Sequence, residues 1–308
     1  MTTRKWCAVV LVGMVILAGA YLAAADQVAY LAAGALLHPL RRGVDQPPPA
    51  GCADAQFAGA GVALRGWTCR ASGEKRGTLV LLHGVADNRA SVAGLAARFT
   101  GSGLDVVAYD SRAHGESGGD ACTYGYWEKT DLRKILDTIA GPVVLLGGSL
   151  GAAVALQEAA DDDRVVGVVA AEVFSDLRTV ARERAPWFLT EGMIRRAFAI
   201  AEDRGQFRID SVSPVDAARR IHVAVLLIHG AEDVHTPADH SRRVLAALAG
   251  PKDLVLVEGA HHNESLGSEG IWQRIERWID DVLTAAFSRR ANTALHPTGG
   301  DARSPAGG

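Results

Sequence analysis

Ser149 lies in a sequence context in which a serine hydroxyl can act as a nucleophile. Residues 147–151 read Gly-Gly-Ser-Leu-Gly, the pattern G-x-S-x-G, between an apolar run and a helix-like run of small apolar residues. In a strand–turn–helix context, this pattern makes a tight turn that raises the serine hydroxyl above a sheet. We expect the N–H of Leu150, at the start of the helix, to donate to a developing oxyanion. The segment therefore predicts acyl transfer through Ser149.

A second G-x-S-x-G pattern is centred on Ser117 in a different context. Charged residues separate it from the preceding apolar run, and Asp120 and Cys122 follow it where an apolar helix would be needed. A nucleophile turn requires a strand directly before the serine and a helix directly after it. We therefore interpret Ser117 as a loop residue.

A serine hydroxyl becomes a strong nucleophile only when a nearby base takes its proton. In chains with the order serine, acid, histidine, the acid follows a late strand and the histidine follows the last one. Asp233 lies in the loop after one late apolar run, and His261 and His262 lie after the next. We expect Asp233 to orient the histidine, with Glu232 as the competing acid. The base is His262 or its neighbour His261.

Continuous apolar runs alternate with helix-like segments over residues 51–288. Strands that are apolar along their whole length are covered on both faces, which predicts a mostly parallel sheet with helices on either side. Residues 174–210 interrupt the alternation and predict a small helical cap insertion. Chemistry in such sheets collects at the carboxyl ends of the strands. The apolar runs are 78–82, 104–109, 142–146, 165–171, 223–228 and 254–257.

Cys52 and Cys69 flank a predicted hairpin whose turn contains Gly59 and Gly61. If the turn is centred between residues 60 and 61, the two cysteines are directly opposite each other. Opposed strand residues lie within the distance that a disulfide can bridge. We expect a Cys52–Cys69 disulfide if the domain is in an oxidising compartment, and two reduced thiols otherwise.

The N-terminus predicts contact with a membrane. Residues 6–25 are uncharged and would form a helix of roughly 30 Å, enough to cross a bilayer core. The two basic residues within 1–5 predict a cytoplasmic N-terminus and an extracytoplasmic catalytic domain. We favour an uncleaved anchor. Ala23 and Ala25 also suit a signal-peptide cleavage site, after which the domain would be secreted.

The segments that flank the predicted sheet domain have little to bury. Residues 26–50 contain three consecutive prolines and are predicted as a linker. Residues 289–308 are rich in Thr, Pro, Gly and Ala and are predicted to be a disordered tail.

The composition excludes several function classes. A net charge of −3 and only 6% aromatic residues give no basis for nucleic-acid binding. The chain has no H-E-x-x-H pattern, no C-x-x-C pair and no G-x-G-x-x-G after a strand, so we expect neither a metal nor a nucleotide cofactor. The expected partners are a small acyl substrate and a membrane. The sequence predicts no oligomeric state.

Over residues 50–288 the chain resembles the α/β-hydrolases, and most closely their serine-aminopeptidase-like and monoacylglycerol-lipase-like branch. The order and spacing of five segments carry this resemblance. They are Leu81-Leu-His83-Gly84, Tyr109-Asp-Ser-Arg112-Ala-His114-Gly-Glu-Ser117, Gly147–Gly151, His229-Gly-Ala-Glu-Asp233 and Gly259-Ala-His-His262-Asn263.

The resemblance implies an eight-stranded α/β-hydrolase sheet and a second oxyanion donor, the N–H of Val85. It places the catalytic histidine at His262, although His261 stands where the family pattern has a glycine. It also implies structural roles for His83 and His114.

The predicted function is a serine hydrolase that cleaves a carboxylic ester or thioester, such as a carboxylesterase, lipase or thioesterase. An apolar anchor would place the enzyme near acyl lipids. The alternatives are a serine peptidase or amidase of the aminopeptidase type, and a membrane-tethered binding protein that keeps the fold without turnover.

Overall fold

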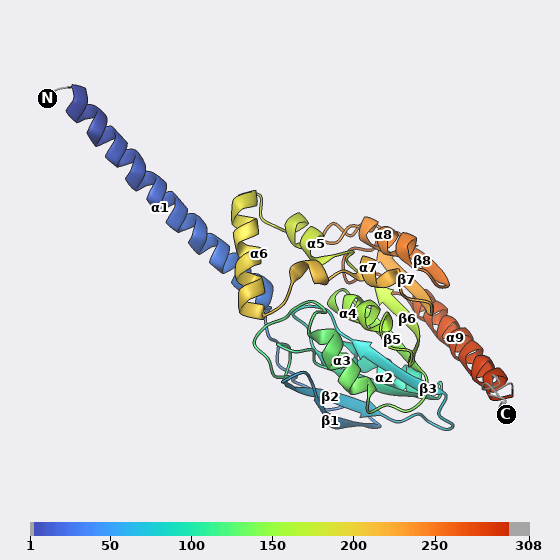
Figure 1. Ribbon diagram of the computed structural model, residues 1–308. Helices are drawn as coiled ribbons and strands as arrows, with labels where there is room; N and C mark the ends of the chain where they lie inside the picture. The colour runs from blue at the N-terminus through green and yellow to red at the C-terminus, as the bar shows by residue number, and fades with distance from the viewer. Residues whose placement is uncertain (1–2, 296–308) are drawn as a thin grey trace, which may run out of the picture.

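Short runs of Val, Leu and Ala form an eight-stranded sheet in the computed structural model, which describes residues 3–295 (Figure 1). The strands are β1 (Cys52–Ala58), β2 (Ala63–Cys69), β3 (Gly77–Leu82), β4 (Leu104–Tyr109), β5 (Val143–Gly148), β6 (Val165–Ala171), β7 (Ala224–Gly230) and β8 (Lys252–Val257). Their order is β1-β2-β4-β3-β5-β6-β7-β8. The strands from β3 to β8 are parallel, and β1 and β2 are antiparallel to their neighbours. The predicted fold class is confirmed.

Helices cover both faces of the sheet, which explains why β3 and β4 are buried along their whole length. Helices α3, α4 and α8 pack in the core of one face, and α2 and α9 pack on the other. The helices are α1 (Thr3–Leu37), α2 (Ala93–Thr100), α3 (Glu128–Leu136), α4 (Leu150–Ala159), α5 (Leu177–Glu183), α6 (Glu191–Gly205), α7 (Pro214–Ala218), α8 (Asp239–Ala247) and α9 (Glu269–Leu295), with short 3-10 turns at Arg89–Val92 and Ile209–Ser211.

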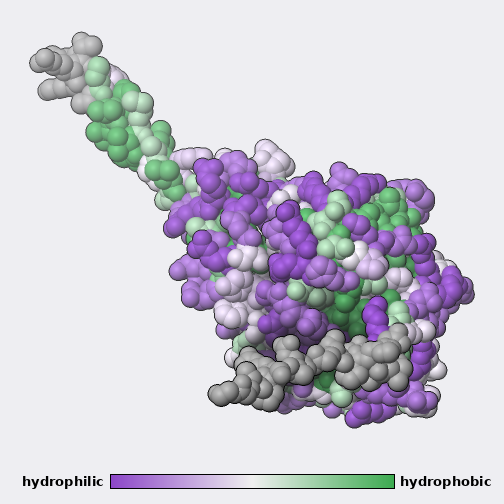
Figure 2. Space-filling view, turned by 45° about the vertical axis from the view of Figure 1, so that its right-hand side comes forward, coloured by the Kyte–Doolittle hydropathy of each residue, from purple (hydrophilic) through white to green (hydrophobic). Residues whose placement is uncertain are grey.

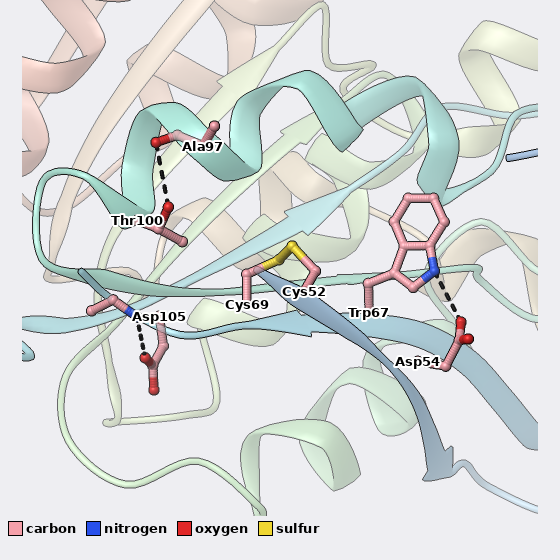
Figure 3. The surroundings of a disulfide bond; sticks show 8 residues. Cys52, Asp54, Trp67, Cys69, Ala97, Thr100 and Asp105 are labelled. Atoms are coloured by element: carbon pink, nitrogen blue, oxygen red, sulfur yellow. Dashed lines mark hydrogen bonds between the residues drawn. A yellow bond between two sulfur atoms is a disulfide. The ribbon is translucent and has the colours of Figure 1, made fainter. Parts of the chain in front are cut away.

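A disulfide joins Cys52 to Cys69 across the β1–β2 hairpin (Figure 3). The two residues are direct partners in the register, with a Cα–Cα distance of 4.0 Å, as the predicted turn position requires. Further along the hairpin, the Trp67 indole N–H donates to Asp54 at 3.1 Å. The bridge and this bond hold the edge strand β1 to the sheet.

The segment over residues 174–210 is helical and contains α5 and α6. Both helices begin at a side-chain cap: Asp176 accepts from the N–H of Thr179, and Thr190 accepts from that of Met193. Such caps satisfy free N–H groups in the first turn. The segment lies above the sheet, between α1 and α8 (Figure 1).

The predicted linker at residues 26–50 is wrong over its first part, because α1 extends into it. The helix continues through this segment as far as Leu37, and the chain is irregular only from residue 38 to the start of the hairpin. Ala29, Ala33 and Leu37 recur every four residues on one face and are buried, and α1 packs on α6. Burial of this apolar face stabilises the last turns of the helix.

The earlier turns of α1 project from the body, and their apolar side chains are exposed. By length and composition, residues 10–37 could cross a membrane. Figure 2 shows mostly apolar side chains along the visible face of the projecting part, in contrast to the largely hydrophilic surface of the body.

At the C-terminus, α9 extends to Leu295, so the first residues of the predicted tail 289–308 are helical. The remaining residues of that predicted tail, 296–308, lie outside the described part of the chain.

Candidate active site

Ser149 occupies a strained turn between β5 and α4. Its φ of 49° and ψ of −108° are rarely adopted by residues other than glycine, and such strain clusters at functional sites. The flanking glycines make this turn possible. A Cβ at Gly147 would lie 2.3 Å from the carbonyl carbon of Gly151, and a Cβ at Gly151 would lie 2.3 Å from the carbonyl oxygen of Leu82. Close backbone packing therefore requires both glycines of the pattern.

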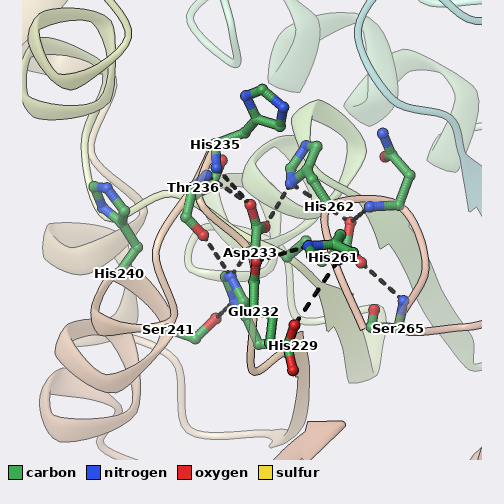
Figure 4. Close-up of polar contacts among 12 residues, drawn as sticks. His229, Glu232, Asp233, His235, Thr236, His240, Ser241, His261, His262 and Ser265 are labelled. Atoms are coloured by element: carbon green, nitrogen blue, oxygen red, sulfur yellow. Dashed lines mark hydrogen bonds and ion pairs between the residues drawn. The ribbon is translucent and has the colours of Figure 1, made fainter. Parts of the chain in front are cut away.

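His262 and Asp233 meet at the carboxyl ends of β7 and β8 (Figure 4). The Nδ1 atom of His262 lies 2.6 Å from Oδ2 of Asp233. The other carboxylate oxygen, Oδ1, accepts the backbone N–H groups of His235 at 2.9 Å and Thr236 at 2.8 Å. These two N–H groups fix the carboxylate plane, so its second oxygen faces the imidazole.

Asp233 is held in its ionised form. Burial opposes ionisation, but hydrogen bonds from His229, His262 and the Thr236 N–H outweigh it and hold the pKa of Asp233 well below its usual range. An ionised carboxylate only accepts hydrogen bonds, so Nδ1 of His262 carries the proton. The other ring nitrogen, Nε2, is then free to accept a proton.

His261 points away from this carboxylate. Its Nδ1 lies 3.0 Å from the backbone oxygen of Glu232, and its side chain is 56% exposed, compared with 11% for His262. The Glu232 carboxylate lies 3.9 Å from the ring of His261 and is itself exposed. Of the two candidate pairs, the structure joins His262 to Asp233 in the more buried position.

Ser149 and His262 line the same pocket, which has a volume of about 410 Å³. Val85, the expected second oxyanion donor, also lines it. The preceding residue, Gly84, lies close to the serine, since a Cβ at Gly84 would be 3.9 Å from the Cβ of Ser149. The remaining lining residues are Glu183, Arg184, Val234, His235 and Asn263.

His83 fixes the loop that carries Val85. Burial and the nearby His114 lower the pKa of His83 to about 4, so its ring is neutral near pH 7. Its Nδ1 donates to the carbonyl of Gly84 at 2.7 Å, and its Nε2 accepts the N–H of Ser111 at 2.9 Å. This imidazole links the loops after β3 and β4, in agreement with the structural role that the resemblance implies.

Glu172 is a residue of this site that sequence reasoning missed. It follows β6 directly, has a positive φ of 54° and is buried. Its carboxylate accepts the backbone N–H groups of Asn263 and Ser265, the latter at 3.0 Å, and one oxygen lies 3.7 Å from Nδ1 of His262. A carboxylate directly after a strand, at the sheet edge that carries Ser149, was the available signal.

Glu172, Asp233 and His262 each offer a possible metal-ligand atom, and these atoms lie within 4.8 Å of one another. Their hydrogen bonds favour a different use. Both Glu172 oxygens accept loop N–H groups, and Asp233 accepts from backbone and imidazole. The arrangement brings two carboxylates to the same nitrogen of His262, Nδ1, and leaves Nε2 for proton transfer.

The serine of the second G-x-S-x-G pattern has a structural role. The Ser117 hydroxyl donates to the carbonyl of Asp110 at 2.6 Å and accepts the N–H of Arg65 at 2.9 Å. Its side chain is buried, and it does not line the pocket of Ser149.

Another serine–histidine–carboxylate chain lies beside the pocket. The Ser175 hydroxyl is 2.8 Å from Nδ1 of His240, whose Nε2 is 2.7 Å from Glu183. Ser175 is fully buried, so its hydroxyl is closed to substrate. This chain ties α5 to α8, and of the two serines Ser149 is the one that lines the pocket.

Comparison with known proteins supports the fold described above. Family models match two overlapping parts of the chain: the serine aminopeptidase S33 family over residues 73–190 and the prolyl oligopeptidase family over residues 138–283. The esterase Pf2001 of Pyrococcus furiosus superposes with a TM-score of 0.63 at 20% identity, over 80% of this chain and 98% of that chain. Together with the eight-stranded sheet, these matches support the α/β-hydrolase superfamily.

Two further proteins are similar to this chain. The uncharacterised protein YqkD of Bacillus subtilis is 31% identical over 196 residues, and the match covers 60% of this chain and 64% of that protein. An acylaminoacyl peptidase of Pyrococcus horikoshii has a TM-score of 0.54 at 16% identity, over 70% of this chain and 38% of that chain. The comparisons support a serine hydrolase and include both an esterase and a peptidase, so they do not select the bond that is cleaved.

Proposed function

We propose that this protein hydrolyses carboxylic esters or thioesters through an acyl-enzyme formed on Ser149. One observation carries the proposal: a serine in a strained strand–helix turn shares a pocket with a histidine whose Nδ1 lies 2.6 Å from a buried carboxylate. The accessible serine, the imidazole with a free nitrogen and the ionised acid are the three parts that nucleophilic acyl transfer requires.

The proposed reaction has two halves. Nε2 of His262 takes the Ser149 proton as the hydroxyl oxygen attacks the acyl carbon, and Asp233 stabilises the imidazolium. The N–H groups of Leu150 and Val85 bind the oxyanion, and each contributes about 3–4 kcal/mol to lowering the barrier. The imidazolium then protonates the leaving alcohol or thiol. In the second half, His262 takes a proton from a water molecule as the water oxygen attacks the acyl carbon. The bond to Ser149 then breaks, the acid leaves, and the imidazolium returns the proton to the Ser149 oxygen.

A fluorophosphonate probe tests the nucleophile. We expect it to label the wild type and the matched Ser117→Ala variant, and to leave Ser149→Ala unlabelled. Labelling is followed by intact mass on protein whose folding has been verified by circular dichroism. A folded wild type that does not react would contradict the proposal and favour a binding protein with the same fold.

Alanine variants of the adjacent histidines test the base. We expect His262→Ala to lower kcat/KM by at least a thousandfold and His261→Ala to change it less than threefold, because only the first ring contacts Asp233. Loss of turnover in His261→Ala alone would reassign the base.

A peptidase is the second candidate function. Both matching family models carry peptidase names, and Glu183 places a carboxylate in the pocket that could face a substrate amine. Matched p-nitrophenyl esters, acyl thioesters and aminoacyl p-nitroanilides separate the two candidates. The ester proposal requires kcat/KM for the ester or thioester to exceed that for the anilide by more than the difference in their spontaneous rates.

We also propose that α1 anchors the protein in a membrane with the catalytic domain on the extracytoplasmic side. The exposed apolar helix, the basic residues before it and the disulfide support this topology. Protease added to bacterial spheroplasts should then degrade the catalytic domain, and carbonate washing should leave the protein in the membrane. A mature chain that begins at Asp26 would instead show cleavage of a signal peptide.

A further inference from the structure

A second cavity, of about 600 Å³, lies between α1, α5 and α6. This volume falls in the range of pockets that hold small organic ligands. Arg184 is the one charged residue among those that line it. The apolar wall includes Leu31, Ala32, Ala35, Val180, Ile194 and Phe198.

Arg184 places this cavity next to the catalytic pocket, because it lines both of them. Its guanidinium donates to the backbone oxygen of His235 at 2.9 Å and to the hydroxyl of Thr236. These two residues also give their N–H groups to Asp233. An apolar group in the cavity would thus lie beside the loop that orients the proposed base.

The α1 wall of the cavity is a fixed part of the body. The carbonyl of Leu37 accepts the N–H of Cys122 at 2.8 Å, and that of Leu36 accepts the Tyr124 hydroxyl at 3.1 Å. Asp26 pairs with Arg196 of α6 at 2.6 Å. Contacts at both ends therefore hold residues 26–37 against the cap.

We propose that the last turns of α1, together with α5 and α6, form a subsite for the acyl chain of a bilayer lipid whose ester or thioester group is cleaved at Ser149. This inference rests on the proposed function and names its substrate class. The lining is apolar, and it adjoins the pocket that holds the nucleophile.

Two observations favour a lipid over another apolar occupant. The wall over residues 28–36 lies at the C-terminal end of the same apolar helix segment, residues 10–37, whose earlier turns are exposed, so the apolar surface of α1 continues into the cavity. The loop between α5 and α6 exposes Trp187 by 95% and Phe188 by 56%, and Phe188 lines the cavity. Aromatic side chains with this exposure favour the membrane–water interface. A lipid chain could pass from the bilayer into this cavity without crossing water.

Tryptophan substitutions in the full-length protein test the subsite. Ala35→Trp places an indole in the cavity from an exposed position, and Ala32→Trp does so from a half-buried one. Ala199→Trp is the matched control on the exposed side of α6. We expect the ratio of kcat/KM for the dodecanoyl ester to that for the acetyl ester to fall about tenfold in both cavity variants and to stay within twofold in the control.

Binding of a fluorescent fatty acid to the inactive Ser149→Ala protein gives a readout without turnover. We expect the affinity to fall at least tenfold when Ala35→Trp is added. Unchanged chain-length ratios and unchanged binding would overturn the subsite. The two proposals can fail separately. If the wild type hydrolysed no ester or thioester, and Ala35→Trp still weakened fatty-acid binding, the proposed function would be refuted and the cavity would be supported as an acyl site.

The bilayer as the source of the chain has its own test. Trp187→Ser should lower hydrolysis of a dodecanoyl ester held in phosphatidylcholine vesicles at least threefold relative to hydrolysis of the same ester free in solution. Equal effects on the two rates would refute the bilayer as the source. A chain-length ratio that depended on enzyme concentration would indicate a second copy of the chain in the cavity and would also overturn the proposal.

Discussion

Replacement of Asp233 by asparagine tests the proton chain directly, because the surroundings dictate how the new amide must lie. Two backbone N–H groups, from His235 and Thr236, point at Oδ1. Turning the amide so that its NH₂ faced them would leave two donors without an acceptor, at a cost of about 1–3 kcal/mol each. The amide oxygen therefore stays on that side, and the NH₂ group faces His262.

This orientation forces the wrong tautomer on the imidazole. Nδ1 of His262 must accept from the amide, so the ring proton moves to Nε2, the nitrogen that the proposed mechanism needs as a base. In triads of this kind the wrong tautomer costs about ten-thousandfold in kcat, equivalent to ~5 kcal/mol. We expect a loss of that size in Asp233→Asn with little change in KM.

The assay is the steady-state hydrolysis of a short-chain p-nitrophenyl ester, with the fluorophosphonate labelling rate as a second readout. Glu232→Gln is the matched control, since this neighbouring acid is exposed and lies 3.9 Å from His261. Its kcat should stay within twofold of the wild type. A kcat of Asp233→Asn within tenfold of the wild type would refute the reasoning. A large loss of kcat in Glu232→Gln would show that Glu232, and not Asp233, is the acid.

Other groups give further predictions. Glu172→Gln should lower kcat/KM about tenfold, because one of the loop N–H groups of Asn263 and Ser265 loses its acceptor; an unchanged kcat/KM would contradict this. His83 is neutral when folded and gains a proton on unfolding below pH 6.5, so its own contribution to the free energy of unfolding should fall by ~3 kcal/mol from pH 6.5 to 4; in urea titrations His83→Gln should lose ~3 kcal/mol less than the wild type over this range, and equal changes would contradict this. Replacing Cys52 and Cys69 by alanine opens a loop with a sequence separation of 17 and should lower the free energy of unfolding by about 3 kcal/mol; an equal loss for the wild type in reductant would agree, and no loss would contradict it.

The sheet could be predicted from the sequence because its signals are local. Continuous runs of Val, Leu and Ala identify strands that are covered on both faces, and a glycine turn sets the register that brings Cys52 opposite Cys69. The turn at Ser149 was equally clear, since its two glycines are required by contacts within the same strand–helix unit and with the adjacent strand.

The course of α1 beyond residue 25 could not be predicted, because its stability comes from distant partners. Asp26 suggested the end of an apolar span, but its carboxylate pairs with Arg196 of α6, 170 residues away in the sequence. Glu172 was missed for the same reason. Its role arises because β6 lies beside β7, which brings its side chain under the loop of His262.

Helix α1 is unbroken from Thr3 to Leu37, and only its final turns are held by the body. The direction in which it leaves the domain is therefore set by its packing on α6 and by the Asp26–Arg196 pair. If the proposed anchor is correct, the catalytic domain rotates together with α1 as one rigid unit when the helix tilt changes. Bilayer thickness, which sets the tilt, would then govern the distance between the pocket mouth and the headgroups.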